Sequence, residues 1–104
     1  MADKIKVIVK RPDELYGHMT NISNTLENMQ KIVEGPIETL TMPGYVLILN
    51  EEGRIRPDIK YNCKVAGFNL YGTFIVAGIQ GDRFADIGIS FDAWKQIINE
   101  SWRA

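Results

Sequence analysis

The sequence has a single cysteine, Cys63, and a single histidine, His18, among its 104 residues. One cysteine cannot form a disulfide within the chain, and one residue of each type cannot complete a zinc site built from Cys and His alone. Neither sign of charge predominates, because the 12 Lys and Arg residues nearly balance the 13 Asp and Glu residues and the net charge is -1. Such a balance gives no general attraction to nucleic acid or to acidic membranes, so we expect neither as a partner.

Long apolar runs are absent as well. The longest runs, at 45–49 and 74–79, are far shorter than the roughly 18 residues needed to cross a membrane. The apolar stretch at 7–9 falls short of the roughly 7–15 residues of a secretory signal. With an unpaired thiol and no export signal, the sequence predicts a cytoplasmic protein. Residues 1–104 suffice for one hydrophobic core and not for two, which predicts a single domain.

Alternation and short apolar runs predict a small sheet. Residues 4–10 alternate between apolar and mostly charged side chains, which is typical of a strand with one solvated face. The same reasoning predicts three further strands, at 37–41, 45–49 and 73–79. The second and third of these are apolar on both faces, as expected of central strands. Asn50–Gly53 is predicted to be a tight turn into a returning strand at Arg54–Arg56. The segment 58–70 is predicted to be a loop with one short extended piece.

A stripe of apolar residues at helical spacing predicts a first helix. The stripe consists of Ile22, Leu26, Met29, Ile32 and Val33. Asn21, Ser23 or Asn24 can cap its start, because a short polar side chain accepts a hydrogen bond from an N–H group of the first turn. Gly35 is predicted to end the helix in a left-handed conformation, and Pro36 cannot continue it.

A second stripe predicts a helix at the end of the chain. Its residues are Phe91, Trp94, Ile97, Ile98 and Trp102, and both tryptophans are expected to anchor the core. Ser90 or Asp92 is expected near its N-cap. Together these elements predict one α+β domain with a mixed or antiparallel sheet of about four to five strands packed by two helices.

Residues that could carry catalysis are few. His18 and Cys63 could act as base and nucleophile if folding brought them together. The plainer interpretation places His18 in a polar loop before the helix and Cys63 in the core as a small apolar residue. Glu51 and Glu52 lie at a turn, where water keeps both ionised, and Asp82, Asp86 and Asp92 do not have the spacing of a calcium loop. We therefore expect no enzymatic activity, no metal and no cofactor.

A basic segment interleaved with aromatic residues is the clearest candidate for binding. Its residues are Arg54, Arg56, Lys60, Tyr61 and Lys64, with Tyr71 nearby. Positive charge beside aromatic rings is typical of sites for phosphate-bearing ligands, although a solvated strand face has the same composition. Glu51 and Glu52 complete the candidate binding residues, because the Asn50–Gly53 turn is expected to be exposed.

Three segments resemble a known family. They are the stretch from Asn24 to Glu38, the Asn50–Gly53 turn and the stretch from Gly72 to Gly78, and the resemblance spans Ile5 to about Gly78. The family consists of small proteins of phages, plasmids and other mobile elements, chiefly of Gram-positive bacteria, and is catalogued as a domain of unknown function. Its members usually have two glycines where this chain has Glu34 and Gly35. The resemblance implies an α/β domain in a mobile-element context, and it implies no reaction.

Three function classes follow from these observations. We expect a non-enzymatic interaction protein that blocks a host enzyme or defence factor, with the Asn50–Gly53 turn and Tyr16, Tyr61 and Tyr71 as contacts. The alternative is a small-ligand binder that sequesters a phosphate-bearing nucleotide signal through the basic segment. An enzyme is the third class, which the sparse catalytic residues disfavour. An exposed strand edge would also permit a homo-oligomer.

Overall fold

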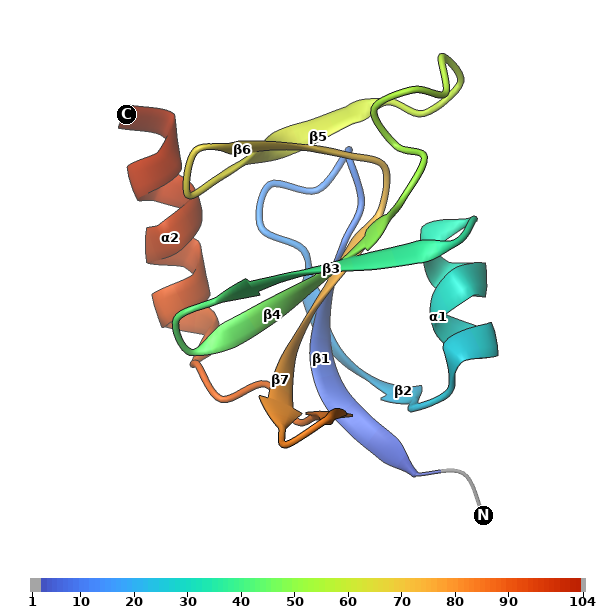
Figure 1. The fold of residues 1–104 in the computed structure, drawn as a ribbon. Helices are drawn as coiled ribbons and strands as arrows, with labels where there is room; N and C mark the ends of the chain where they lie inside the picture. The colour runs from blue at the N-terminus through green and yellow to red at the C-terminus, as the bar shows by residue number, and fades with distance from the viewer. Residues whose placement is uncertain (1–2, 104) are drawn as a thin grey trace.

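A six-stranded antiparallel sheet forms the centre of the molecule (Figure 1). This computed structural model describes the backbone of residues 3–103 and the side chains of residues 3–101. The sheet contains β1 (Lys4–Lys10), β2 (His18–Ser23), β3 (Ile37–Met42), β4 (Tyr45–Asn50) and β7 (Phe74–Gln80) in the order β2-β1-β7-β4-β3, and β8 (Arg83–Ala85) pairs with the end of β7. A separate hairpin consists of β5 (Tyr61–Val65) and β6 (Phe68–Tyr71), and the helices are α1 (Leu26–Val33) and α2 (Phe91–Arg103).

The predicted class is confirmed: the domain is α+β, with two helices and an antiparallel sheet. The strand count is larger than predicted, because β2, β5, β6 and β8 are short and carry many polar residues. In Figure 1 the two helices lie on opposite sides of the sheet, and the β5–β6 hairpin lies on the same side as α2. The molecule therefore has three layers.

Alternation along the strands builds a core on each face of the sheet. On one face, Val7 and Val9 of β1 pack with Met29 and Val33 of α1. On the other face, Ile8 of β1 packs in a cluster with residues of the hairpin and of α2, namely Cys63, Val65, Leu70, Trp94 and Ile98. Trp94 is fully buried, as predicted for a core anchor. The side chain of Trp102, the other predicted anchor, lies outside the described residues.

The first helix begins later than predicted. Ile22 belongs to β2, where it pairs with Ile5 and is buried, and α1 starts only at Leu26. Thr25 caps the helix, since its Oγ1 accepts a hydrogen bond of 3.1 Å from the N–H of Asn28. Ile22 therefore reaches the core beside α1 through its pairing with β1, and its helical spacing from Leu26 and Met29 is coincidental. The second helix has the predicted cap, with Ser90 Oγ accepting from the N–H of Ala93 at 3.0 Å.

The end of α1 also differs from the prediction. Glu34, with φ of 65°, adopts the left-handed conformation that was predicted for Gly35. Gly35 is needed for a different reason: a Cβ there would come within 2.8 Å of Nδ2 of Asn50. That amide is buried at the end of β4 and donates a 3.0 Å hydrogen bond to the carbonyl of Val33. Asn50 therefore ties the last turn of α1 to the sheet.

The segment after β4 is arranged differently from the predicted hairpin. Arg54–Arg56 forms turns and no strand, and β4 pairs instead with β3 and β7. The segment 58–70, predicted as a loop with one short extended piece, contains β5 and all but the last residue of β6, which are joined by a turn at Ala66 and Gly67. Both turn residues have positive φ, 49° and 87°, as in a type I′ turn. The hairpin escaped prediction because Ala66 is not a typical residue of such a turn.

Candidate functional site

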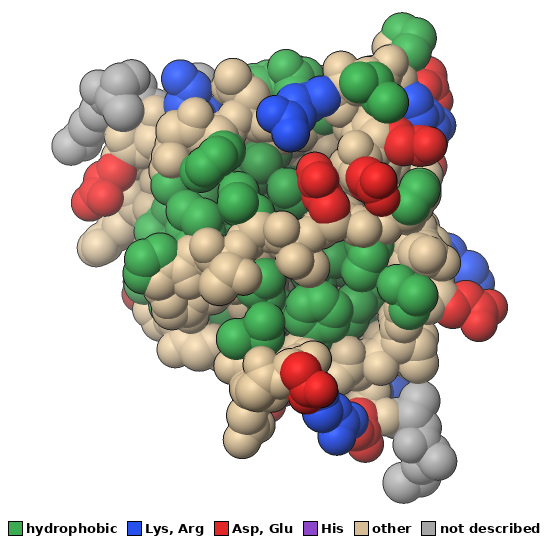
Figure 2. Space-filling model, viewed as in Figure 1, with side chains coloured by type: hydrophobic (Ala, Val, Ile, Leu, Met, Phe, Trp, Pro, Cys, Tyr) green, Lys and Arg blue, Asp and Glu red, His purple; other side chains and the backbone are tan. Residues whose placement is uncertain are grey.

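A groove runs between the β3–β4 hairpin and β6. It encloses about 160 Å³ and is lined by Glu38, Thr39 and Leu40 of β3, Leu49 and Asn50 of β4, Gly53 and Arg54 of the following turn, and Phe68, Asn69, Leu70 and Tyr71 of β6. Figure 2 shows hydrophobic side chains gathered on this face between β3 and the β5–β6 hairpin, with charged side chains at one end. The groove therefore combines an apolar floor with a charged end.

The β3 wall of the groove is a free strand edge. β3 pairs only with β4 among the described strands. The N–H of Glu51 donates to the carbonyl of Pro36 at 2.8 Å, which makes 36/51 a hydrogen-bonded pair in this register. Such pairs alternate along an antiparallel ladder, so Glu38, Leu40 and Met42 turn their backbone groups toward β4. Ile37, Thr39 and Thr41 turn theirs away from it.

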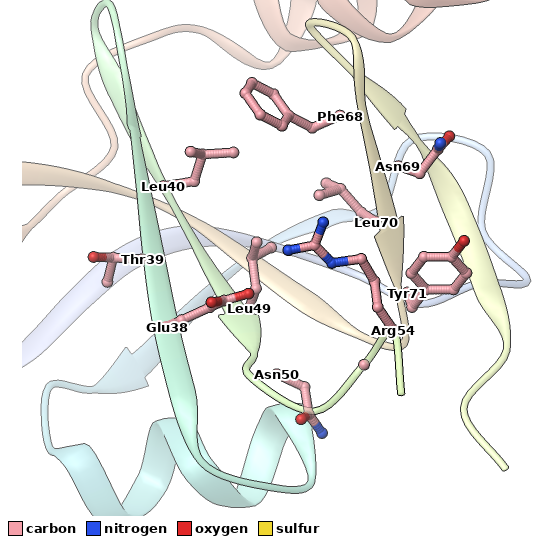
Figure 3. A pocket seen from close by; sticks show the side chains of 11 residues that line it. Glu38, Thr39, Leu40, Leu49, Asn50, Arg54, Phe68, Asn69, Leu70 and Tyr71 are labelled. Atoms are coloured by element: carbon pink, nitrogen blue, oxygen red, sulfur yellow. The ribbon is translucent and has the colours of Figure 1, made fainter. Parts of the chain in front are cut away.

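The β6 wall is the edge of the smaller hairpin. β6 pairs only with β5 among the described strands, and the turn makes Val65 and Phe68 a hydrogen-bonded pair. By the same alternation, the backbone groups of Asn69 face away from β5. In Figure 3, Phe68 and Leu70 point toward the β3–β4 hairpin, whereas Asn69 and Tyr71 point away from it. The four residues together line the groove, as expected where the edge of a strand faces a cavity.

Arg54 is the cation of the groove. Contacts of the preceding turn hold the backbone of Arg54 in place. The Oδ1 atom of Asn50 accepts a 2.7 Å hydrogen bond from the N–H of Glu52. Gly53 packs closely against Tyr71, since a Cβ at Gly53 would lie 3.2 Å from the carbonyl oxygen of Tyr71. The guanidinium then extends over the groove between Leu49 and Leu70 (Figure 3). Among the described residues, no carboxylate forms an ion pair with it.

The neighbouring Arg56 is a structural residue. Its guanidinium lies 2.7 Å from Asp58 Oδ2 and 3.6 Å from Glu52 Oε1, and it donates a hydrogen bond of 3.3 Å to the carbonyl of Glu34. The hydrogen bond with Asp58 raises the pKa of Arg56 and lowers that of Asp58. Arg56 thus fastens the loop after β4 to the end of α1, and its charge is already neutralised.

Of the remaining predicted binding residues, Tyr71 lines the groove as part of β6, and the others lie in other places. Lys60 lines a separate cavity of about 220 Å³ with Arg56 at the end of α1. Lys64 pairs with Asn69 across the hairpin and so shares its outer face, and Tyr61 and Tyr71 stack edge to face on that surface with ring centroids 5.3 Å apart. Glu51 is exposed. The predicted basic residues are therefore spread over three surfaces, and Arg54 alone lines the groove.

Tyr16 has a structural contact. Its hydroxyl donates to Asn99 Oδ1 at 2.9 Å, and its carbonyl accepts a 2.8 Å hydrogen bond from Nε1 of Trp94. These bonds attach α2 to the loop between β1 and β2.

The single histidine and cysteine lie on opposite faces of the sheet. His18 pairs with Val9 across β1 and β2, so its side chain shares the face of Val9, where α1 packs. Its Nδ1 lies 2.8 Å from Oε2 of Glu14. Cys63 is buried in the other core, and burial raises the pKa of its thiol. The sheet therefore separates the base from the thiol.

A buried lysine beside the groove wall was not predicted. Lys10 is 2% exposed, and its ammonium donates a 2.5 Å hydrogen bond to Oδ1 of Asn62. The amide nitrogen of Asn62 donates to the carbonyls of Lys10 and Gly72 at 3.1 and 2.7 Å. Burial lowers the pKa of Lys10, and Cys63 acts in the opposite direction. Lys10 ends a strand whose other lysines are exposed, so its pattern suggested a solvated side chain.

Two features are absent from the described residues, a metal-binding cluster and a membrane-spanning helix. In residues 3–101, no three His, Cys, Asp or Glu side chains come together to hold a metal ion. No helix in the described part of the chain has the length and apolar character needed to cross a bilayer.

Comparison with known proteins places the chain in a family. Residues 5–95 match the family described as a domain of unknown function, DUF3846. No curated protein and no solved structure matches the chain. Because the match covers most of the sequence, the chain belongs to the DUF3846 family.

Proposed function

We propose that this protein is a non-enzymatic binding protein whose groove between β3 and β6 receives part of a partner. One observation carries the proposal: the exposed guanidinium of Arg54, which forms no ion pair with any described residue, lies over apolar side chains between two strand edges that are not paired with each other. An arginine in this setting favours an anionic group on the partner. The leucines beneath it favour an apolar group next to that anion.

Exposed apolar side chains extend the proposed contact beyond the groove. Phe68 on the rim is 48% exposed, and Ile55, next to Arg54 in sequence, is 79% exposed. Ile55 lies in the loop after β4, which projects from the body of the molecule at the upper right of Figure 1. Aromatic and arginine residues supply much of the binding energy of protein interfaces, and an exposed apolar residue beside them adds buried area.

The partner we propose is a host protein. The resemblance to small proteins of phages and other mobile elements supports a role in which the chain occupies and inhibits a host enzyme or defence factor in the cytoplasm. The separation of His18 and Cys63 by the sheet supports a role without catalysis.

A phosphate-bearing nucleotide is a weaker candidate for the groove. Small-molecule pockets usually enclose about 300–1,000 Å³, whereas the groove encloses about 160 Å³. The other basic residues of the segment, Arg56, Lys60 and Lys64, do not line it. A nucleotide would therefore meet one cation and remain largely exposed.

The proposal is tested by capture from a bacterial lysate followed by native mass spectrometry. Purified wild-type protein is compared with Arg54→Glu and with Lys31→Glu, which makes the same change of charge at an exposed position of α1 on the other face of the sheet. A protein partner should be recovered with wild type and with Lys31→Glu and lost with Arg54→Glu.

Two results would contradict the proposal. A partner held equally by Arg54→Glu would show that binding occurs outside the groove. A small added mass that depends on Arg54, with no protein partner, would favour the nucleotide-binding alternative.

A further inference from the structure

We infer that the occupant of the groove is an extended segment of a partner polypeptide that adds as a strand to the free edge of β3. The segment places an acidic side chain at Arg54 and an apolar side chain two residues away, over Leu40 and Phe68. This inference rests on the proposed function and names the kind of partner that the groove takes.

The backbone of β3 supplies the first argument. Ile37, Thr39 and Thr41 present N–H and C=O groups on the side away from β4, and Thr39 lines the groove. An unpaired strand edge is a template for another extended chain, and several peptide-binding domains use such an edge. The free edge of β3, which meets the groove at Thr39, thus offers a row of backbone groups for hydrogen bonds that a small anion cannot use.

The spacing of the side chains supplies the second argument. In Figure 3 the guanidinium of Arg54 lies between Leu49 and Leu70, and Leu40 and Phe68 lie further along the groove toward the tip of the β5–β6 hairpin. Side chains two residues apart in a strand point to the same face, about 6.6 Å from each other. A strand paired with β3 can therefore place an acidic and an apolar side chain on the groove at the same time.

Glu38 restricts where the acidic side chain of the segment can lie. Its carboxylate lines the same groove on the side of Arg54 opposite Phe68, and it forms no ion pair with any described residue. A second carboxylate placed beside Glu38 would be repelled, so a segment with the acidic residue in the wrong position binds poorly.

The test starts from a display library of random decapeptides selected on the wild-type protein, with peptides that also bind Arg54→Glu removed. We expect the selected peptides to share an acidic and an apolar residue at a spacing of two. Their affinities are then measured by fluorescence anisotropy against Thr39→Pro and Thr39→Ala.

The two variants at position 39 separate backbone pairing from side-chain contact. Proline removes the outward N–H of Thr39 without removing a hydrogen bond to β4, so the fold should persist. Alanine removes the side chain and keeps the N–H. We expect Thr39→Pro to weaken the peptides about three- to tenfold, as the loss of one backbone hydrogen bond implies, and Thr39→Ala to change affinity less than about twofold. If Thr39→Pro does not fold, peptides N-methylated at single backbone positions provide the same comparison, with every second position sensitive.

Three results would overturn the inference. Peptides that depend on Arg54 and bind Thr39→Pro as well as Thr39→Ala would leave the groove as a binding site and exclude strand addition. A selection that yields no Arg54-dependent peptide would exclude an extended segment, while the capture experiment would still decide the proposed function. A concentration-dependent dimer of wild type that Thr39→Pro abolishes, measured by analytical ultracentrifugation, would assign the edge to a second copy.

Discussion

The two hairpins that wall the groove are attached to the rest of the protein in different ways. The β3–β4 hairpin is part of the central sheet, because β4 pairs with β7 from Val46 to Ile48. The β5–β6 hairpin pairs with no other strand among the described residues. Its attachments are buried side chains, including Val65 and Leu70 in the core under α2, and the hydrogen bonds of Asn62.

This difference means that one wall of the groove is fixed by a backbone ladder and the other by a few side chains. A ladder spreads its stabilisation over many hydrogen bonds, whereas a small set of buried side chains can be disrupted by one substitution. We therefore expect changes in the β5–β6 hairpin to alter the width of the groove while the central sheet keeps its structure.

The largest effect that separates the two walls is expected from Asn62→Ala. The substitution removes both hydrogen bonds donated by the amide and leaves the ammonium of Lys10 buried without its acceptor. A buried charge without its partner costs about 2–4 kcal/mol of the free energy of unfolding. Urea denaturation followed by circular dichroism measures this loss.

Asn69→Ala is the matched control, because Asn69 lies on the exposed outer face of the same hairpin. A surface substitution of this kind should cost no more than about 0.5 kcal/mol. Equal losses in the two variants would show that Asn62 is not a main attachment of the hairpin.

A smaller effect is expected in the pH dependence of stability. Burial lowers the pKa of Lys10 from its ordinary value of 10.5, although Cys63, Glu14 and Asp13 act in the opposite direction. Between the lowered pKa and 10.5, the unfolded chain binds more protons at this position than the folded chain, so the contribution of Lys10 to stability rises with pH. The free energy of unfolding of wild type relative to Lys10→Met should therefore increase as the pH approaches 10.5.

The thiol of Cys63 also changes its protonation between the folded and unfolded chains in this alkaline pH range, so its effect has to be separated from that of Lys10. Burial raises the pKa of its thiol above the ordinary 9.0, so stability falls with pH through that group. Lys10 and Cys63 also shift each other's pKa, so both chains are compared in a Cys63→Ala background, where no thiol titrates. A difference that stays constant with pH would show that Lys10 has the same proton affinity in the folded and unfolded chains.

The sequence allowed much of one wall to be predicted and little of the other. The strands at β3 and β4 were predictable because apolar residues and the Pro43–Gly44 turn mark them locally. The β5–β6 hairpin carries polar residues on its outer face and a turn that begins with Ala66, so local pattern and turn chemistry gave no signal. Arg54 was predicted as a binding residue from composition. Its position over a groove depends on the packing of that hairpin, which sequence pattern does not report.

The smallest predicted effects come from two residues with positive φ, one near each wall. Glu34 ends α1 with φ of 65°, and Ala66 begins the β5–β6 turn with φ of 49°. Glycine adopts this conformation without the strain of a Cβ, so Glu34→Gly and Ala66→Gly should each stabilise the protein by about 0.5–1 kcal/mol.

Amide hydrogen exchange of the two glycine variants tests whether the hairpin opens by itself. If it does, the amide of Leu70 in β6 exchanges when the hairpin opens, and the amide of Ile75 in β7 exchanges only on global unfolding. Ala66→Gly should then slow exchange at both amides, because both kinds of opening disrupt the turn at Ala66. Glu34→Gly should slow exchange at Ile75 alone, since α1 stays folded while the hairpin is open. Equal slowing at both amides in both variants would mean that the two walls unfold together. The groove would then be a rigid cleft, and strand addition at β3 would have to occur without movement of β6.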